Sequence, residues 1–354
     1  MSDFKFVPTI DLAMLDNPSS RTQLVQQLRQ ALLDVGMFYV ANPPLSPTVV
    51  AEAKTQSEAF FALPFAEKTK LDIANSPSFL GYAMLGAERT NNQVDWREHL
   101  TLASPGPESI SGPVYRRLLG SGQWPSASLL PRFTPVLQTL LAESTALVTT
   151  LRRLIAEAIG VDSDKLESLF DAHHQQYRIR LIRYPEVAAS AEETQSLGAH
   201  QDTSFNTLIF QIGAQHCLQA RNNHGEWVDC PPIPDQPIFV VGRGCQAATH
   251  GLCRAPFHRV IPPAPGSGSR LSIVVTTGIG YDTPLKSPKT SEVLSTMRTQ
   301  IVANNPGHEV SLNEGLEEDD EFETVGMKVL HKLAKSYPEV TRRWYPELLV
   351  EPSH

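Results

Sequence analysis

Between residues 177 and 280, short runs rich in β-branched and aromatic residues alternate with Gly, Pro and Asn. The runs read YRIRLIRYP, NTLIFQI, CLQARN, EWVDCPP, PIFVVG, FHRVIPP and RLSIVVTTGIG. Short strands at close spacing, with turn residues between them, are typical of an antiparallel sandwich or barrel rather than of a parallel sheet. The chain is therefore predicted to be mainly β with flanking helices.

Helical periodicity surrounds this β-rich region. Residues 133–160 carry apolar side chains at intervals of three and four, which predicts a long helix with one buried face that braces the sheet. The N-terminal part reads as strand, helix, strand, helix over residues 7–15, 19–36, 37–42 and 47–63, with Ser20 as a candidate helix cap. The last sixty or so residues return to a helical pattern.

Composition and charge exclude two classes of partner. With 41% hydrophobic and 19% charged residues, the chain has the composition of an ordinary globular protein. Its net charge of -8 and the lack of a basic stripe argue against a nucleic-acid partner, which needs clustered Lys and Arg. No run approaches the roughly 18 apolar residues of a membrane span. We therefore expect a small-molecule partner, while the sequence does not indicate an oligomeric state.

The four cysteines point to a reducing compartment. Cys217, Cys230, Cys245 and Cys253 form no C-x-x-C pair, and the chain starts without an apolar signal segment. A zinc site drawn from these cysteines with His216 and His250 would lack the spacing of two to four residues that structural zinc sites use. We expect reduced cysteines and a cytoplasmic location.

A candidate metal site lies in the segment LGAHQDTSFNTLIFQ, residues 197–211. His200 and Asp202 are two residues apart, so in a strand they would project from the same face. A transition metal bound by imidazole and carboxylate needs at least a third ligand, and two histidines with one carboxylate form the facial triad of non-haem Fe(II) oxygenases. His258, in the β-rich run CRAPFHRVIPP, is the candidate for the third ligand.

A candidate carboxylate site follows in the segment RLS. Arg270 and Ser272 share one face of a predicted strand. A guanidinium group beside a hydroxyl group is suited to bind a carboxylate through several hydrogen bonds.

The ordered set of H-x-D, a distal His and R-x-S resembles the Fe(II)- and 2-oxoglutarate-dependent dioxygenases of the isopenicillin N synthase-like superfamily. The likeness extends over nearly the whole chain, through PTIDL, GMFYVAN, FFALPFAEK, GYAMLGAE, DWREHLTL and QWP in its N-terminal part. The motifs LIRYPEVAASAEE, RAPFHRV and GSRLS are most similar to the cephalosporin-forming expandases and isopenicillin N synthase. Five motifs in the expected order make this resemblance specific.

The resemblance implies a double-stranded β-helix (jelly roll) with one metal site. It implies an N-terminal helix and strand region over residues 1–125. Residues 126–354 would be the jelly-roll catalytic region with its bracing helix and C-terminal helices, and the two regions would form one compact unit. His200, Asp202 and His258 would bind Fe(II), leaving positions for 2-oxoglutarate and O2. Arg270 and Ser272, with Tyr184, would hold the far carboxylate of 2-oxoglutarate.

The chain departs from the family pattern at several positions. The usual NHG reads Asn42, Pro43, Pro44, and the usual GD reads Gly244, Cys245, although neither position binds metal. Ile182 stands where relatives have asparagine or arginine. Arg180 and Arg183 match arginines of the expandases and of isopenicillin N synthase, and they are candidate substrate ligands, together with Phe205 beside the metal motif.

The resemblance implies an oxygenase that oxidises a C–H bond of a small molecule, by hydroxylation, desaturation or ring modification, in secondary metabolism. One alternative is an oxidase of the isopenicillin N synthase type, in which Arg270 and Ser272 would bind the substrate's own carboxylate. Another is a catalytically silent binding protein, against which the presence of all three metal ligands argues.

Overall fold

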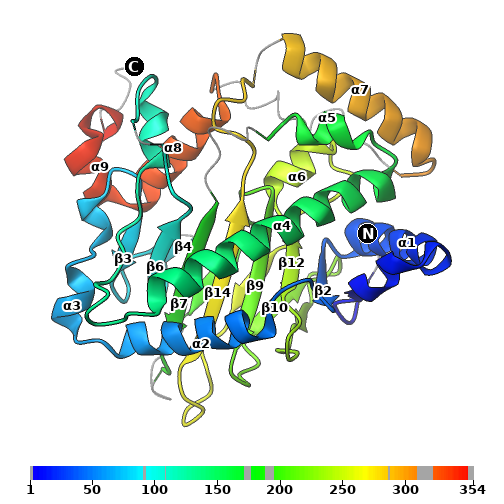
Figure 1. The fold of residues 1–354 in the computed structure, drawn as a ribbon. Coiled ribbons are helices and arrows are strands. Elements are labelled where there is room, and N and C mark those ends of the chain that lie inside the picture. Colours follow the sequence, from blue (N-terminus) through cyan, green and yellow to red (C-terminus); the bar gives the residue numbers. More distant parts are fainter. Residues whose placement is uncertain are drawn as a thin grey trace.

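The computed structural model describes residues 3–90, 93–107, 109–170, 177–187, 195–285, 288–308 and 322–349. Within them, two β-sheets pack face to face, and helices cover the outer face of the larger sheet (Figure 1). This arrangement confirms the predicted mainly β jelly-roll core with flanking helices.

The larger sheet has eight strands in the described residues, in the order β1-β2-β12-β9-β14-β7-β6-β3. They are β1 (Thr9–Asp11), β2 (Met37–Ala41), β3 (Gly81–Ala83), β6 (Glu98–Ala103), β7 (Arg178–Tyr184), β9 (Asn206–Ile212), β12 (Ile238–Val241) and β14 (Arg270–Thr277). Neighbours are antiparallel except β1 and β2, which are parallel. Strands from the N-terminal region therefore extend both edges of a sheet whose centre comes from the β-rich runs.

The smaller sheet has the order β11-β10-β13-β8. Its strands are β8 (Leu197–His200), β10 (Leu218–Arg221), β11 (Trp227–Asp229) and β13 (His258–Val260). A separate pair, β4 (Arg89–Thr90) and β5 (Gln93–Val94), lies outside both sheets. Residues of both sheets form one apolar cluster, which includes Ile182, Tyr184, Ile209, Leu218 and Val260.

Strand alternation separates this inter-sheet cluster from the helix-facing core. In β7, Ile179 and Leu181 belong to the core under the helices, whereas Ile182 and Tyr184 belong to the cluster between the sheets. Successive side chains of a strand point to opposite faces, so even-numbered positions of β7 face the interior of the jelly roll near this end of the strand. This assignment decides which candidate site residues meet.

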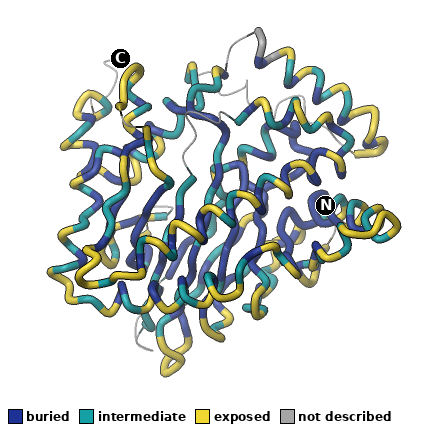
Figure 2. Tube along the Cα trace, in the orientation of Figure 1, coloured by how far each residue is buried: buried dark blue, intermediate teal, exposed yellow. Residues whose placement is uncertain are grey.

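Three long helices cover the larger sheet: α1 (Pro18–Asp34), α2 (Pro47–Ala62) and α4 (Phe133–Ile159). Figure 1 shows α4 crossing in front of the strands, and Figure 2 shows its exposed outer side and buried inner side. Helix α4 buries an apolar stripe, as its periodicity predicts, and ends at Gly160 in the left-handed conformation (φ 72°), which glycine adopts without strain. The bracing helix is thus confirmed.

The other described helices occupy the ends of the sheet. They are α3 (Phe65–Thr69), α5 (Ser163–Glu167), α6 (Arg243–Ala248), α7 (Pro288–Asn304), α8 (Val325–Ser336) and α9 (Pro338–Trp344), with 3-10 turns at Leu12–Asp16, Ile73–Asn75, Val114–Leu119 and Pro346–Leu349. The return to helix near the C-terminus is confirmed for the described residues. Helix α8 and the start of α6 lie at the same end of the strands (Figure 1).

Two local predictions near the N-terminus need correction. Helix α1 is capped by Asn17, whose side chain accepts a hydrogen bond from the backbone N–H of Ser19, and not by Ser20. Pro18 at the first helical position favours this earlier start because its missing N–H and fixed φ suit the first turn. The strand expected over residues 7–15 is limited to Thr9–Asp11, since a 3-10 turn begins at Leu12.

Candidate metal centre and keto acid site

Strand pairing brings His200 and His258 together. They are direct register partners across antiparallel β8 and β13, and their ring centroids are 4.2 Å apart. Strand β10 lies on the other side of β13, so His258 is on an inner strand of the smaller sheet, whereas β8, which carries His200, is an edge strand of that sheet. A sequence separation of 58 residues becomes a side-chain contact because the chain returns antiparallel to β8.

Asp202 completes a three-residue cluster. Its Oδ1 lies 3.5 Å from Nε2 of His200 and 3.8 Å from Nε2 of His258. One potential ligand atom from each of the three residues lies within 4.8 Å of the other two. Asp202 is beyond the end of β8, so the expectation that it shares a strand face with His200 is wrong, although the two side chains do converge.

The loop that carries Asp202 is fixed by the start of α6. The backbone N–H of Arg243 donates to the carbonyl oxygen of Asp202 at 2.7 Å, and that of Gly244 donates to Ser204 at 3.0 Å. A Cβ atom at Gly242 would lie 2.0 Å from the carbonyl oxygen of Ser204. Glycine is therefore required at 242, because only glycine permits this close approach of two backbones.

Backbone carbonyls set the tautomer of both histidines. Nδ1 of His200 lies 2.9 Å from the carbonyl oxygen of Gly198, and Nδ1 of His258 lies 3.3 Å from that of Pro256. A carbonyl oxygen can only accept, so Nδ1 must carry the proton in each ring. Nε2 then presents a lone pair toward Asp202, as metal-binding histidines do.

The electrostatics of the cluster suit a cation. Burial lowers the pKa of His258 to about 4, with a further contribution from the nearby His200, so the ring is neutral near pH 7. Burial alone would raise the pKa of Asp202, but His258 and His200 hold it below its ordinary value. A neutral His258 and an ionised Asp202 are the protonation states that metal binding requires of these two ligands.

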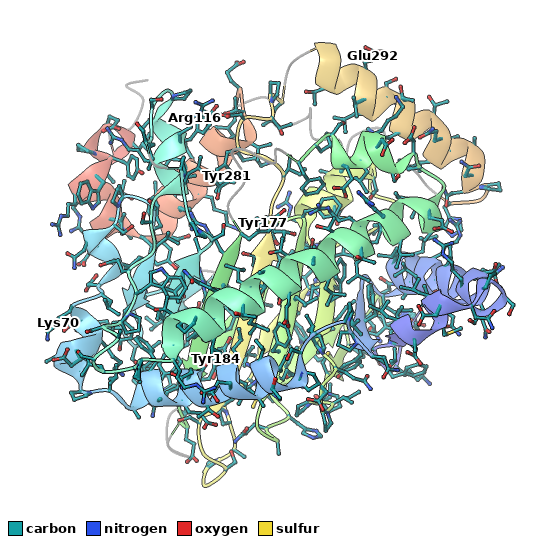
Figure 3. All side chains as sticks on the ribbon, viewed as in Figure 1. Lys70, Arg116, Tyr177, Tyr184, Tyr281 and Glu292 are labelled. Atoms are coloured by element: carbon teal, nitrogen blue, oxygen red, sulfur yellow. The ribbon has the colours of Figure 1, made fainter. Side chains whose placement is uncertain are left out.

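Arg270 lies in the interior of the jelly roll without a carboxylate partner among the described residues. It is 2% exposed, and its guanidinium carbon lies 5.0 Å from the ring centroid of Tyr184, its register partner. Nη2 donates to Oε1 of Gln211 at 3.1 Å, while Nε and Nη1 have no hydrogen-bond partner in the described structure. Tyr184 is the last residue of β7, and Tyr177 directly precedes the first residue of the same strand (Figure 3).

Ser272 lies two residues along β14, on the same face as Arg270. It is 2% exposed, and its Oγ also has no hydrogen-bond partner among the described residues. A buried charge and a buried hydroxyl without partners are costly, and an unobserved ligand is the usual explanation. Their donor atoms match a carboxylate, so these residues fit the distal group of 2-oxoglutarate.

Sequence reasoning missed Gln211. Its side chain links the Arg270 guanidinium to the carbonyl oxygen of Cys230, to which its Nε2 donates at 2.9 Å. Gln211 is a polar residue at an inward-facing position directly after the apolar residues 208–210 of the strand, and that signal alone could have identified it.

The candidate substrate residues are separated by the sheet. Arg180 lies on the interior face of β7, where Nε donates to Thr101 at 3.1 Å and Nη1 lies 3.7 Å from Glu88. Arg183 lies on the opposite, helix-facing side, and its Nη1 pairs with Glu98 at 2.9 Å. Strand alternation therefore places Arg183 away from the metal cluster, which does not support a role as a substrate ligand.

Phe205 lies in the helix-facing core. It is 0% exposed and makes an edge contact with Phe170, with ring centroids 5.0 Å apart. The structure thus favours core packing over the pocket-lining role considered for it. We expect Phe205→Ala to lower the free energy of unfolding by about 3–5 kcal/mol through loss of buried area and creation of a cavity. Denaturant unfolding measures this loss, and a loss below about 1 kcal/mol would contradict it.

The cysteines form no disulfide: all four are free and buried. In the part of the chain that the structure describes, His200, Asp202 and His258 are the group of His, Cys, Asp or Glu residues close enough to hold a metal. The alternative zinc site is therefore not formed by the described residues. Over the same residues, no helix has the length and apolar character needed to cross a membrane.

A jelly roll with two histidines, a carboxylate and a buried arginine that has no carboxylate partner in the described residues defines a class: the ferrous oxygenases that use a keto acid. The chain belongs to the 2OG-Fe(II) oxygenase superfamily. The profile of that superfamily matches residues 173–278, and the profile described as non-haem dioxygenase in morphine synthesis N-terminal matches residues 7–127. The protein is therefore an oxidoreductase that depends on Fe(II), 2-oxoglutarate and O2.

Curated relatives support this membership over the whole chain. A 2-oxoglutarate-dependent dioxygenase, frbJ, of Dothideomycetidae sp. (strain 11243) is 35% identical over 98% of this chain and 94% of the relative. A 2-oxoglutarate-dependent dioxygenase of Gibberella zeae is 30% identical over 98% and 93%. A homoarginine-6-hydroxylase of Glycine max is 30% identical over 82% and 91%.

Solved structures show the same fold. A putative 2OG-Fe(II) oxygenase family protein from Caulobacter crescentus has a TM-score of 0.72 at 19% identity, covering 94% of this chain and 99% of that chain. A full-length Neurospora crassa protein, solved in complex with alpha-KG, has a TM-score of 0.70 at 19% identity, covering 86% and 97%.

Proposed function

We propose that this chain oxidises a C–H bond of a small organic molecule, with iron bound by His200, Asp202 and His258. The observation that carries the proposal is the convergence of these three side chains from a strand, a loop and a second strand, with both Nε2 atoms oriented toward the carboxylate. Ferrous iron with bound 2-oxoglutarate supplies an oxidant from O2, with release of succinate and carbon dioxide.

Arg270, Ser272 and Tyr184 hold the distal carboxylate of 2-oxoglutarate in this proposal. The unpaired Nε and Nη1 of Arg270 and the unpaired Oγ of Ser272 supply the donors, while the Tyr184 ring packs against the guanidinium and restricts its orientation. Gln211 positions the same guanidinium through its Oε1. Burial of these residues excludes water, which strengthens the ionic interaction.

The position of Arg270 relative to the metal cluster agrees with this role. Tyr184, the register partner of Arg270, belongs to the same apolar cluster between the two sheets as Ala220, the register partner of His258. Arg270 and the metal cluster therefore lie on the same interior of the jelly roll, where a dicarboxylate would bind between them in this proposal.

The names of the relatives indicate a small-molecule substrate, but they differ in which molecule it is. Names among them include homoarginine-6-hydroxylases and a jasmonate-induced oxygenase, and the Neurospora crassa protein was also solved with thymine. We propose that the reaction is hydroxylation of a small molecule in secondary metabolism, and that it takes place in the cytoplasm. We also propose that regions 1–125 and 126–354 of the chain form one compact unit. The particular similarity of this chain's motifs to those of the expandases and isopenicillin N synthase stays a prediction.

A binding experiment tests the cofactor assignment. Fe(II) and then 2-oxoglutarate are added to the purified protein without oxygen, and we expect a weak visible charge-transfer band when the keto acid chelates iron. The control is 2-oxobutyrate, which has the same chelating end but no distal carboxylate, and it should bind much more weakly. Iron binding without any band would favour the oxidase alternative instead.

A further inference from the structure

Strand β8, which carries His200 at its end, pairs irregularly with the rest of the smaller sheet. Its register pairs with β13 are Leu197 with Val260 and His200 with His258, so two residues of β8 lie opposite one residue of β13. Such a bulge disrupts the ladder locally and leaves a residue unpaired. Pairing with β13 alone therefore fixes the position of His200 less firmly than a regular ladder would.

Asp95 holds the other side of β8. It is the first residue of the motif DWREHLTL, and it is 0% exposed. Its Oδ1 accepts hydrogen bonds from the backbone N–H of Gly198 at 3.2 Å and from Nε2 of Gln195 at 3.0 Å. The backbone N–H of Trp96 donates to the carbonyl oxygen of Gln195 at 2.9 Å. Asp95 and Trp96 therefore supply the hydrogen bonds that a neighbouring strand would otherwise give to this edge.

Gly198 connects Asp95 to the metal ligand His200. Its backbone N–H donates to Asp95, while its carbonyl oxygen lies 2.9 Å from Nδ1 of His200 and accepts the proton of that nitrogen. A displacement of Gly198 would therefore move the acceptor that orients the His200 ring. The same ring presents Nε2 to Oδ1 of Asp202 at 3.5 Å, so its orientation decides the geometry of the metal cluster.

The carboxyl group of Asp95 is itself held in place. Oγ1 of Thr90 donates to its Oδ2 at 2.7 Å, and Nη2 of Arg97 lies 3.7 Å from the same oxygen. The backbone N–H of Asp95 donates to the carbonyl oxygen of Glu88 at 3.0 Å, and the Glu88 side chain pairs with Arg97 at 2.8 Å. Because both oxygens of Asp95 have partners, the side chain can hold Gly198 in one position.

From these contacts we propose that Asp95 is a positioning residue for the iron ligand His200 and acts through the backbone of Gly198. The inference rests on the proposed function, which assigns His200 to iron, and it extends that function by giving the N-terminal region a part in metal binding. Asp95 lies 103 residues before Gly198, within the N-terminal profile match of residues 7–127, whereas His200 lies within the match of residues 173–278. The N-terminal region thus orients a ligand of the catalytic region.

Metal titration in the absence of 2-oxoglutarate tests the proposal. Co(II) is the probe, because nitrogen and oxygen sites bind it at least as tightly as Fe(II) and its visible absorption reports binding. Asp95→Ala should weaken Co(II) binding by about tenfold, the lower end of the range for residues that orient metal ligands, since Asp95 acts through a peptide group. Thermal unfolding of the metal-free variant shows whether it is folded.

Two further variants separate the hydrogen bond to Gly198 from charge and from general destabilisation. Asp95→Asn keeps an acceptor oxygen for Gly198 and places an amide group before the Thr90 hydroxyl, so its Co(II) affinity should stay within about threefold of that of the unmodified protein. Asp72→Ala is the matched control, because Asp72 is a partly buried aspartate whose Oδ1 accepts from the backbone N–H of Ala74 at 2.8 Å. It should lose stability and keep its Co(II) affinity.

Imidazole nitrogen NMR of the metal-free protein gives a readout that a purely structural role of Asp95 would not change. With isotope-labelled histidine, the His200 ring of the unmodified protein should show one tautomer, with the proton on Nδ1. Asp95→Ala should shift this signal or give a mixture of tautomers. The His258 signal should not change, because its Nδ1 faces the carbonyl oxygen of Pro256 instead. The signal that is absent from His200→Ala identifies the His200 ring.

The proposal is overturned if Asp95→Ala binds Co(II) within about twofold of the unmodified protein, or if its His200 signal does not change. An equal loss of affinity in Asp95→Asn would assign the effect to charge, and an equal loss in Asp72→Ala would assign it to destabilisation, so either result also overturns it. If Asp95→Ala does not fold, Asp95→Ser replaces it, because the shorter hydroxyl cannot reach Gly198 but leaves room for a water molecule. If the unmodified protein binds no Co(II), the metal assignment itself fails, which is distinct from a failure confined to the Asp95 variants.

Discussion

Asp202→Ala is expected to abolish iron binding and to lower turnover by more than about 100-fold. Even partners that only orient metal ligands change affinity or activity by about 10- to 100-fold, so the loss of a ligand should exceed that range. His200→Ala should give the same result, since Nε2 of His200 lies 3.5 Å from Asp202. Iron content after gel filtration and succinate release measure the two effects.

The fold should survive both substitutions. His200 and Asp202 are only partly buried, so their removal leaves no large cavity in the core. His216→Ala, which removes an exposed histidine outside the cluster, is the matched control and should retain iron and activity. Normal turnover in His200→Ala would show that the iron assignment is wrong.

Arg270→Met is expected to weaken 2-oxoglutarate binding by roughly 100-fold or more while leaving the fold intact. Removing one partner of a buried, hydrogen-bonded charge pair costs about 2–5 kcal/mol of binding free energy. The protein without ligand should lose little stability, because Nε and Nη1 of Arg270 have no partner in the described structure. Replacing a buried charge of this kind with an apolar side chain of similar length is often neutral or stabilising.

Two titrations separate binding from folding in this variant. The charge-transfer band gives the dissociation constant of 2-oxoglutarate, and thermal unfolding gives the midpoint with and without the keto acid. The keto acid should raise the midpoint of the unmodified protein and not that of Arg270→Met. Arg221→Met, at an exposed position of β10, is the control. If the affinity of Arg270→Met for 2-oxoglutarate is within twofold of that of the unmodified protein, Arg270 does not bind 2-oxoglutarate.

The organisation of the fold could be predicted largely from local patterns. The apolar period of residues 133–160 predicted α4, and the short β-rich runs predicted an antiparallel core, because side-chain period depends only on neighbouring residues. Element boundaries were less accurate. Asn17 and Pro18, rather than Ser20, decide where α1 begins, since competing caps lie within three residues.

The candidate site could be predicted by residue type and order, but not by geometry. Alternation in β7 indicates that Arg180 and Arg183 lie on opposite faces, yet it does not say which face meets the metal cluster. Only the tertiary structure shows that Arg183 lies on the face covered by the helices, where it pairs with Glu98. Phe205 likewise required the contact with Phe170 before its place in the core was known.

The sequence by itself determined the chemical groups: two histidines and an aspartate for a metal, and an arginine with a serine two residues apart for a carboxylate. Tertiary structure alone decided which groups meet. Pairing of β8 with β13 brings His200 to His258, and packing of α8 brings Lys332 to Thr203, 129 residues away in the chain. The physical reason is that local patterns depend on interactions between near neighbours, whereas strand register and helix packing depend on burial of surfaces contributed by the whole chain.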